Sequence, residues 1–202
     1  HLREYEFTTP ELYNSIHLIR HKKYAIQEGA INIENIQNIL NNIQVVEEPK
    51  LPFPQADSFE RVINLCELLK QKGFISKNDI TQNYDFDYRQ TNYYSSAARY
   101  LGLIKDVYEN RQTGCSLTQE GFRIFNLPIV ERQLEFVKLI LTHTVFQNTL
   151  NLYFEKGDAP TKDEVVEIMK EAQLYNIDSE QTYRRRASTI ISWINWILGL
   201  IE

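Results

Sequence analysis

Residues 85–118, DFDYRQTNYYSSAARYLGLIKDVYENRQTGCSLT, have the pattern of one helix followed by a β-hairpin. Asp85 or Asp87 can begin the helix, which we expect to run to about Leu101 and to stop at Gly102. The hairpin is predicted as a strand, a turn and a return strand at residues 103–108, 109–114 and 115–118. This segment therefore predicts a small domain in which a two-stranded wing follows a helix.

The residues upstream complete this domain. Ser58, or Asp57 before it, can cap a helix with an apolar face that ends at Lys72-Gly73, and Ser76 can cap a short helix of roughly 76–83. A short helix, a longer helix and a hairpin in this order are typical of a helix-turn-helix with a β-wing. Another helix begins near Leu117 and continues through Phe125. We assign residues 58–127 to a first winged-helix domain.

Residues 128–202 repeat this plan. We expect a long helix over about 130–155, a helix capped by Thr161 and a last helix that is capped by Ser179 and ends at Gly199. The pentapeptide YLGLI at Tyr100–Ile104 aligns without a gap with ILGLI at Ile197–Ile201. The prediction is a mainly α protein with tandem winged helix-turn-helix domains and a small β-wing in the first of them.

The remaining segments are a helical amino-terminal block, residues 1–46, and a linker, residues 47–57. In the block, Pro10 is placed to open one helix, and Ile33, Ile36 and Ile39 begin the spacing of a second helix that continues to Ile43. The linker contains three prolines, which predicts a stiff irregular segment.

Composition limits the function classes. The chain has 202 residues, a net charge of −5 and 24% charged residues, which is ordinary for a globular protein and unlike a strongly basic nucleic-acid binder. No apolar run approaches the roughly 20 residues that span a bilayer, and no charged-then-apolar leader is seen. We expect a cytoplasmic protein without a membrane partner, and expect Cys66 and Cys115 to be reduced thiols that pack as small hydrophobes.

The helices at 85–101 and 179–199 each carry an outward polar side without carboxylates on a helical wheel. Arginine and asparagine can bind base edges, and hydroxyl and amide side chains commonly bind phosphate oxygens, so these faces suit duplex DNA. Arg111 is placed at the tip of the wing. The predicted DNA contacts are Tyr88, Arg89, Asn92, Ser95, Arg99, Arg111, Gln181, Arg184, Arg185, Arg186, Ser188, Thr189 and Ser192.

Two alternatives stay open for these faces. The first is that they are the polar surface of a protein-interaction domain. The second concerns Arg184, Arg185 and Arg186, which lie near the start of a helix, where the helix dipole disfavours positive charge. Either a phosphate backbone compensates them, or they pair with Asp178, Glu180 or the acidic helix at 163–171.

Three motifs occur in order and resemble the winged-helix modules attached to bacterial restriction–modification proteins. They are PFPQADSFERV at 52–62, DYRQTNYY at 87–94 with YLGLI at 100–104, and TYRRRAST at 182–189 with Trp193 and Trp196. The resemblance covers residues 52–202 and implies that the chain holds DNA while a separate nuclease domain or subunit cuts it. It also implies DNA contacts by Arg89, Gln90, Asn92 and Arg184 to Arg186.

A catalytic site is not predicted, nor are a cofactor and a metal. A restriction nuclease needs clustered carboxylates for Mg²⁺ with a lysine beside one of them, and the one carboxylate-x-Lys here is Glu48-Pro49-Lys50 in the linker, with no preceding Asp. His143 is expected to be a packing residue. We therefore expect sequence-specific binding of duplex DNA, as the recognition part of a type II restriction endonuclease or a related regulator. The alternatives are an interaction scaffold, including a dimer interface between two copies, and an enzyme whose site lies in residues 1–46.

Overall fold

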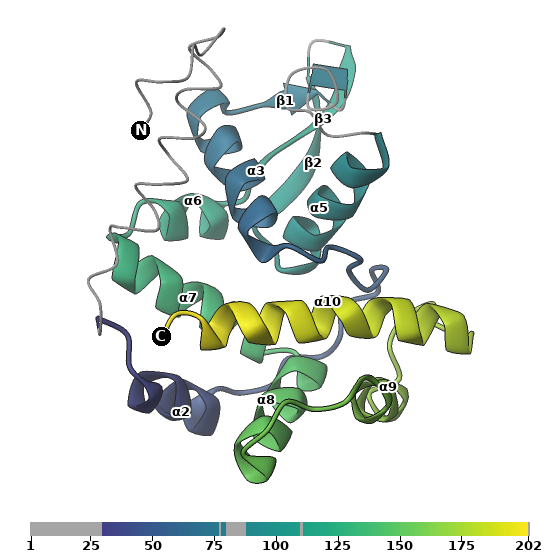
Figure 1. The fold of residues 1–202 in the computed structure, drawn as a ribbon. Helices are drawn as coiled ribbons and strands as arrows, with labels where there is room; N and C mark the ends of the chain where they lie inside the picture. The colour runs from purple at the N-terminus through teal and green to yellow at the C-terminus, as the bar shows by residue number, and fades with distance from the viewer. Residues whose placement is uncertain (1–29, 77, 80–87, 110, 202) are drawn as a thin grey trace, which may run out of the picture.

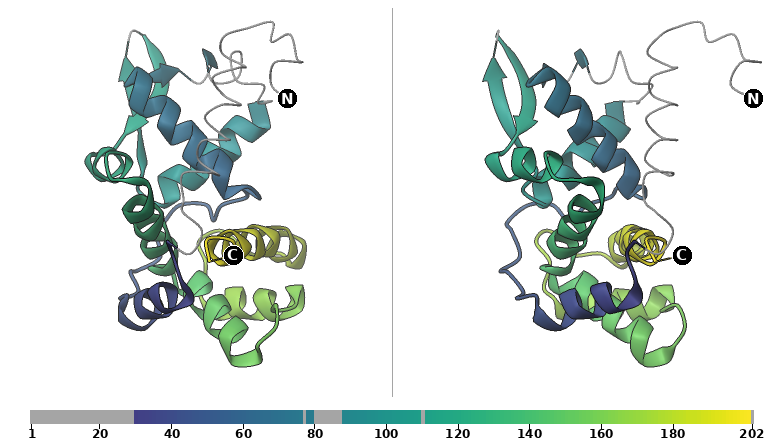
Figure 2. Two further views of the ribbon diagram at one scale, coloured as in Figure 1. Left: turned by 60° about the vertical axis from the view of Figure 1, so that its left-hand side comes forward. Right: turned by 90° about the vertical axis from the view of Figure 1, so that its left-hand side faces the viewer.

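The computed structural model describes residues 30–76, 78–79, 88–109 and 111–201. This part of the chain is mainly α-helical, with eight helices and one three-stranded antiparallel sheet. An upper layer contains the sheet, α3 and α5, a lower layer contains α2, α8 and α9, and α10 runs between the two layers (Figures 1 and 2). The expected helix that starts near Pro10 lies outside the described residues.

The upper layer is built from α3 (Phe59–Lys72), β1 (Ile75–Ser76), α5 (Tyr88–Tyr100), β2 (Ile104–Glu109) and β3 (Gln112–Leu117). The strand order is β1-β3-β2, with both pairs antiparallel. The predicted hairpin is present, but its strands extend closer to the tip than expected, so that Glu109 pairs with Gln112. Strand β1 was not predicted, and most of the expected short helix at 76–83 lies outside the described residues.

Two glycines shape this layer. Gly102 ends α5 with φ +69°, a conformation that is open to glycine and strained for most other residues. Gly114 lies in β3 opposite β1, where a Cβ atom would overlap the Ile75 carbonyl oxygen and the Phe74 ring. Both positions therefore need glycine, one for its backbone angle and the other for the close approach of two strands.

The hairpin leads into α6 (Gln119–Phe125) and α7 (Ile129–Leu141). The lower layer follows with α8 (Thr144–Lys156) and α9 (Lys162–Glu171), after which α10 (Glu180–Leu198) returns to the middle. Ser58, Thr161 and Ser179 accept hydrogen bonds as the N-caps of α3, α9 and α10, as predicted. The predicted long helix at 130–155 is wrong, because the chain turns at Thr142 and His143 and forms α7 and α8 instead.

Helix α2 (Ile33–Asn42), predicted from its isoleucine spacing, packs against α7. Asn32 and Asn35 form a reciprocal capping box at its start, each side chain accepting the other residue's backbone N–H. The linker, residues 47–57, has no helix or strand, but it is not a solvated spacer. Phe53 and Ala56 are only 2% and 1% exposed, so the linker belongs to the core.

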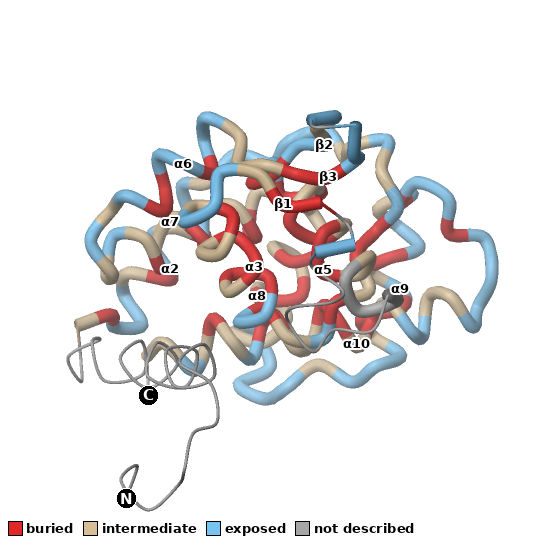
Figure 3. Tube along the Cα trace, turned by 90° about the horizontal axis from the view of Figure 1, so that it is seen from above, coloured by how far each residue is buried: buried red, intermediate tan, exposed pale blue. Residues whose placement is uncertain are grey.

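One continuous core joins the two layers. Phe59 of α3 packs edge-on against Trp193 of α10, with ring centroids 4.9 Å apart, and Phe53 lies between Tyr100 and Phe146. Viewed from above, the buried residues run through α3 and β3 at the centre, and the far end of the hairpin is exposed (Figure 3). The layers predicted as separate tandem domains therefore share aromatic contacts, and the tandem winged-helix arrangement stays a prediction.

Within the described residues, none of the helices is both long and apolar enough to cross a membrane. Cys66 and Cys115 are both buried and are not joined in a disulfide, in agreement with their expected role as packing residues.

Candidate nucleic-acid interface

Helix α5 keeps only part of its predicted polar face. Ser95 is 6% exposed, and its hydroxyl donates to the Asn92 carbonyl at 3.3 Å, so the expected outward position of Ser95 is wrong. Arg99 donates from Nη2 to Asp106 of β2 at 2.7 Å. Asn92 is half-buried. The side chains of Tyr88 and Arg89 lie outside the described part of the chain.

The middle of α10 is covered by the linker. Thr189 is fully buried, where its hydroxyl accepts the Ala56 N–H at 3.1 Å and donates to Asp57 Oδ1 at 3.2 Å. Ser192 donates to the Asp57 carbonyl, and the Trp193 indole N–H donates to the Ala56 carbonyl at 2.8 Å. The helical wheel placed Thr189 and Ser192 on an open face, which is wrong because the wheel does not include the linker.

The first arginine of the run at 184–186 is neutralised within the chain. Arg184 Nη2 lies 2.6 Å from Asp163 Oδ1 of α9, and its Nε lies 3.6 Å from Glu180. Pairing with Glu180 and the acidic helix was one of the two open alternatives, and it is confirmed for this residue. Ser188 accepts a hydrogen bond from Lys162 at 2.8 Å.

The next two arginines differ from Arg184. Within the described residues, no carboxylate lies at ion-pair distance from Arg185 or Arg186. Arg185 is exposed. Arg186 is half-buried, and its Nε is enclosed without a hydrogen-bond partner among the described residues. Burial lowers the pKa of the Arg186 guanidinium, the charge of Arg185 lowers it further, and Tyr93 of α5 acts in the opposite direction.

Two more predicted contacts are exposed. Arg111 lies at the turn between β2 and β3 with φ +61°, so it occupies the hairpin tip as expected. Gln181 is exposed in the first turn of α10. The residues available for binding are thus Asn92, Arg111, Gln181, Arg185 and Arg186, on three elements.

The expectation of carboxylate-free faces needs correction. Asp106 reaches Arg99, Asp57 reaches Thr189, and Asp163 reaches Arg184, each from another element. The absence of acidic residues along one helix therefore did not describe the surface around it. The region around Arg185 and Arg186 keeps an unpaired positive charge.

The prediction did not foresee a cluster that joins the linker to α5 and α8. The Tyr100 hydroxyl donates to Glu48 Oε2 at 2.5 Å, and His143 Nδ1 lies 3.3 Å from Glu48 Oε1. The Tyr100 and His143 rings stack with centroids 4.2 Å apart, and both residues are 4% exposed. Burial raises the pKa of Tyr100, and the charge of Glu48 and its hydrogen bond raise it further.

This cluster identifies the structural roles of two residues. His143 is a packing residue, as expected, and it occupies the N-cap position of α8 without a side-chain capping hydrogen bond. Glu48, considered in the sequence only as a nuclease carboxylate, accepts a hydrogen bond across the core. Over the residues that the structure describes, no group of three or more His, Cys, Asp or Glu side chains is placed to hold a metal ion.

These features define a mainly helical protein with a small antiparallel sheet and a shared core. Residues 61–202 match the model of a family described as a domain of unknown function, DUF7226. The match covers most of the chain, and the protein belongs to this family. Comparisons with curated proteins and with solved structures gave no match.

Proposed function

We propose that this protein binds duplex DNA in a sequence-specific manner. The observation that carries the proposal is the arrangement of α3, β1, α5 and the β2–β3 hairpin with strand order β1-β3-β2, which has the order of elements of a winged helix-turn-helix. In such domains the last helix enters the major groove and the hairpin contacts the backbone or the minor groove. Here these elements are α5 and the hairpin with Arg111 at its tip.

The chemistry of α5 supports base contacts. Asn92 is partly exposed, and an asparagine amide can bind adenine N6 and N7 with two hydrogen bonds. Arg89 belongs to the same helix by sequence, where an arginine can bind guanine O6 and N7. Arg99, which is engaged by Asp106, is left with a role in holding α5 against β2.

The net charge of −5 affects the strength of binding. Non-specific affinity comes from phosphate neutralisation, so an acidic protein with few free arginines binds random DNA weakly and depends more on specific contacts. The finer proposal, that the chain is the recognition part of a restriction endonuclease with a separate nuclease domain or subunit, rests on the resemblance of its three motifs to such modules.

A salt series tests the proposal. We expect the full chain to bind a labelled random-sequence duplex with log K falling linearly with log salt concentration, at a slope near −0.9 per phosphate contacted. Selection from a random duplex library should then enrich a site, and Asn92→Ala should weaken discrimination at one base pair by about 1–3 kcal/mol. Binding absent at low salt, or present but independent of salt, refutes the proposal.

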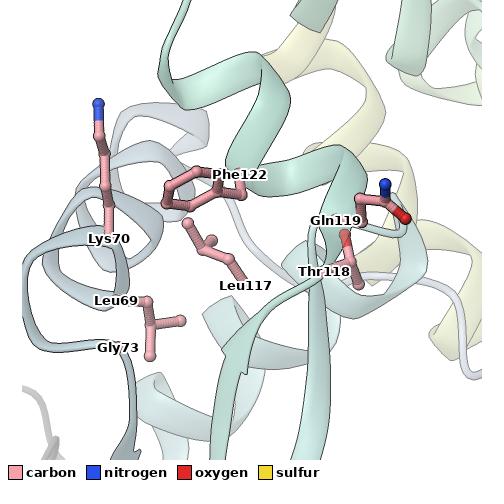
Figure 4. Close-up of a pocket in the computed structure, with 7 residues that line it drawn as sticks. All are labelled: Leu69, Lys70, Gly73, Leu117, Thr118, Gln119 and Phe122. Atoms are coloured by element: carbon pink, nitrogen blue, oxygen red, sulfur yellow. The ribbon is translucent and has the colours of Figure 1, made fainter.

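A second candidate is a protein-interaction module, either a scaffold or a regulator. The observation that favours it is a hollow of about 290 Å³ between α3 and α6, lined by Leu69, Leu117 and Phe122 among others (Figure 4). Phe122 is 56% exposed there and adds apolar surface beside the hollow. Salt-independent dimerisation that Phe122→Ala abolishes would favour this candidate.

A further inference from the structure

We propose that Arg185 and Arg186 of α10 form a phosphate site that binds the DNA backbone, while α5 contacts the bases. This inference rests on the proposed function and deepens it, because it divides the work between two helices. It assigns α10 a positioning role on the duplex in place of the base-reading role that its sequence suggests.

The first step is the accessible length of α10. Its middle cannot enter a groove, because the side chains of Thr189 and Ser192 are hydrogen-bonded to Ala56 and Asp57 of the linker. The preceding two turns are free of the linker and carry Gln181, Arg185 and Arg186. Of the predicted DNA contacts on α10, those left open to a duplex therefore lie in its amino-terminal part.

The second step is the unbalanced charge. Arg185 and Arg186 follow each other in α10, and neither has a carboxylate at ion-pair distance within the described residues. Elsewhere in the described part of the chain, Arg99, Arg123, Arg132 and Arg184 all pair with carboxylates. Arg186 is also half-buried, so water solvates its charge poorly, and an anion that binds the rest of its guanidinium group would stabilise that charge.

The third step is the donor chemistry of this part of α10. Guanidinium groups donate hydrogen bonds to phosphate oxygens, and two of them follow each other here. Lys162, held by Ser188 on the adjoining turn, adds a further positive charge nearby. The predicted ligand is a phosphodiester.

The location favours a backbone phosphate of the duplex that α5 contacts. Helix α10 packs against α3, and α3 packs against α5, so α5 and α10 belong to one packed unit that can contact a single duplex. Phosphate contacts set the register of a protein on DNA without carrying sequence information. Substitution at this site should therefore weaken binding to all sequences alike.

The test compares adjacent arginines of α10 in the full chain. For a labelled random-sequence duplex, the slope of log K against log salt should lose about 0.9 in magnitude with Arg185→Ala and about twice that with the double variant Arg185→Ala/Arg186→Ala. Arg184→Ala is the matched control, since Arg184 is already neutralised by Asp163, and it should change the slope by much less. Arg185→Lys/Arg186→Lys keeps both charges and should retain most of the slope.

The outcomes separate the two proposals. If the wild type shows no salt-dependent binding, the proposed function fails and this inference fails with it. If the wild type shows a steep slope that the double variant keeps, with its circular dichroism unchanged, the phosphate site is refuted and DNA binding stands.

A second arm distinguishes the source of the phosphate. Inorganic phosphate is added in place of chloride at equal ionic strength, and thermal melting is recorded without DNA. One outcome overturns the assignment to the DNA backbone. In it, phosphate raises the Tm of the wild type but not that of the double variant, while the two proteins have the same salt slope for DNA binding. Loss of the DNA slope without such a rise in Tm supports it.

Discussion

Tyr100 shows how one buried hydroxyl joins three parts of the chain. It lies at the end of α5, stacks on His143 before α8 and donates to Glu48 of the linker at 2.5 Å. A hydrogen bond to a charged group contributes about 1.5–3 kcal/mol to stability. We expect Tyr100→Phe to lower the free energy of unfolding by about this amount at pH 7, measured by urea denaturation.

The same residue predicts a pH dependence. Its pKa is raised in the folded state by burial and by Glu48, so the folded protein resists deprotonation more than the unfolded chain does. The stability from Tyr100 is therefore complete below about pH 10 and falls as the pH rises above the unfolded pKa. Tyr100→Phe should have a flatter stability profile between pH 9 and 11.

Tyr108→Phe is the matched control, because Tyr108 is 72% exposed at the hairpin. Its profile should follow that of the wild type. An equal alkaline loss of stability in the wild type and in Tyr100→Phe would contradict the assigned role of this hydroxyl.

At the scale of elements, the pairing of the linker with α10 is the contact with the clearest energetic consequence. Thr189 is the acceptor for the Ala56 N–H in a fully buried position. Valine has nearly the same shape and no acceptor, so Thr189→Val should leave that N–H unsatisfied and cost about 1–3 kcal/mol. Chemical denaturation measures the loss, and amide hydrogen exchange should show faster exchange at Ala56.

Ser188→Ala serves as the comparison for this change. Ser188 neighbours Thr189, and its hydroxyl accepts a hydrogen bond from the Lys162 amine that is exposed to solvent, so its loss should cost less than about 0.5 kcal/mol. If both variants were equally stable, the linker would not be held by α10 in solution.

The elements also show what could be predicted from the sequence. Ser58, Thr161 and Ser179 cap helices as expected, because capping depends on residues three positions apart. The break between α7 and α8 has no glycine or proline, and it depends on His143 meeting Tyr100 and Glu48 from distant segments. Local pattern therefore located most helices and missed the turn that only the tertiary structure fixes.

The candidate site was less predictable for the same reason. The helical wheel placed Ser95, Thr189 and Ser192 on open faces. In the structure, residues from distant parts of the sequence bond to Thr189 and Ser192, and Ser95 is buried. The glycine of the repeated LGL motif also has a different backbone conformation in each copy, since Gly102 has φ +69° and Gly199 has φ −67°. Arg111 on the hairpin turn and Arg185 on α10 are exposed, as their expected outward positions require.

At the scale of the whole molecule, the shared core predicts a single unfolding transition. Phe53 contacts Tyr100 above and Phe146 below, with centroids 5.4 and 5.8 Å apart. Phe53→Ala should cost about 3–5 kcal/mol, a large share of the about 5–15 kcal/mol typical of a domain. Far-UV circular dichroism and tryptophan fluorescence should shift together.

Phe122→Ala is the control, since this ring is 56% exposed and its loss should change stability little. Two separate transitions in the wild type, one reported by Trp193 and Trp196 and the other by the remaining helices, would show that the layers unfold as independent domains.

The buried linker limits where the chain can be truncated for recombinant expression. The family match begins at residue 61, yet Phe53, Ala56 and Phe59 lie before it and are buried. A recombinant fragment started at the edge of the family model would leave the Trp193 indole N–H without its acceptor and expose the aromatic rings that Phe59 covers. The folded core therefore begins before the first residue of the family match. Fragments for expression should start upstream of Glu48.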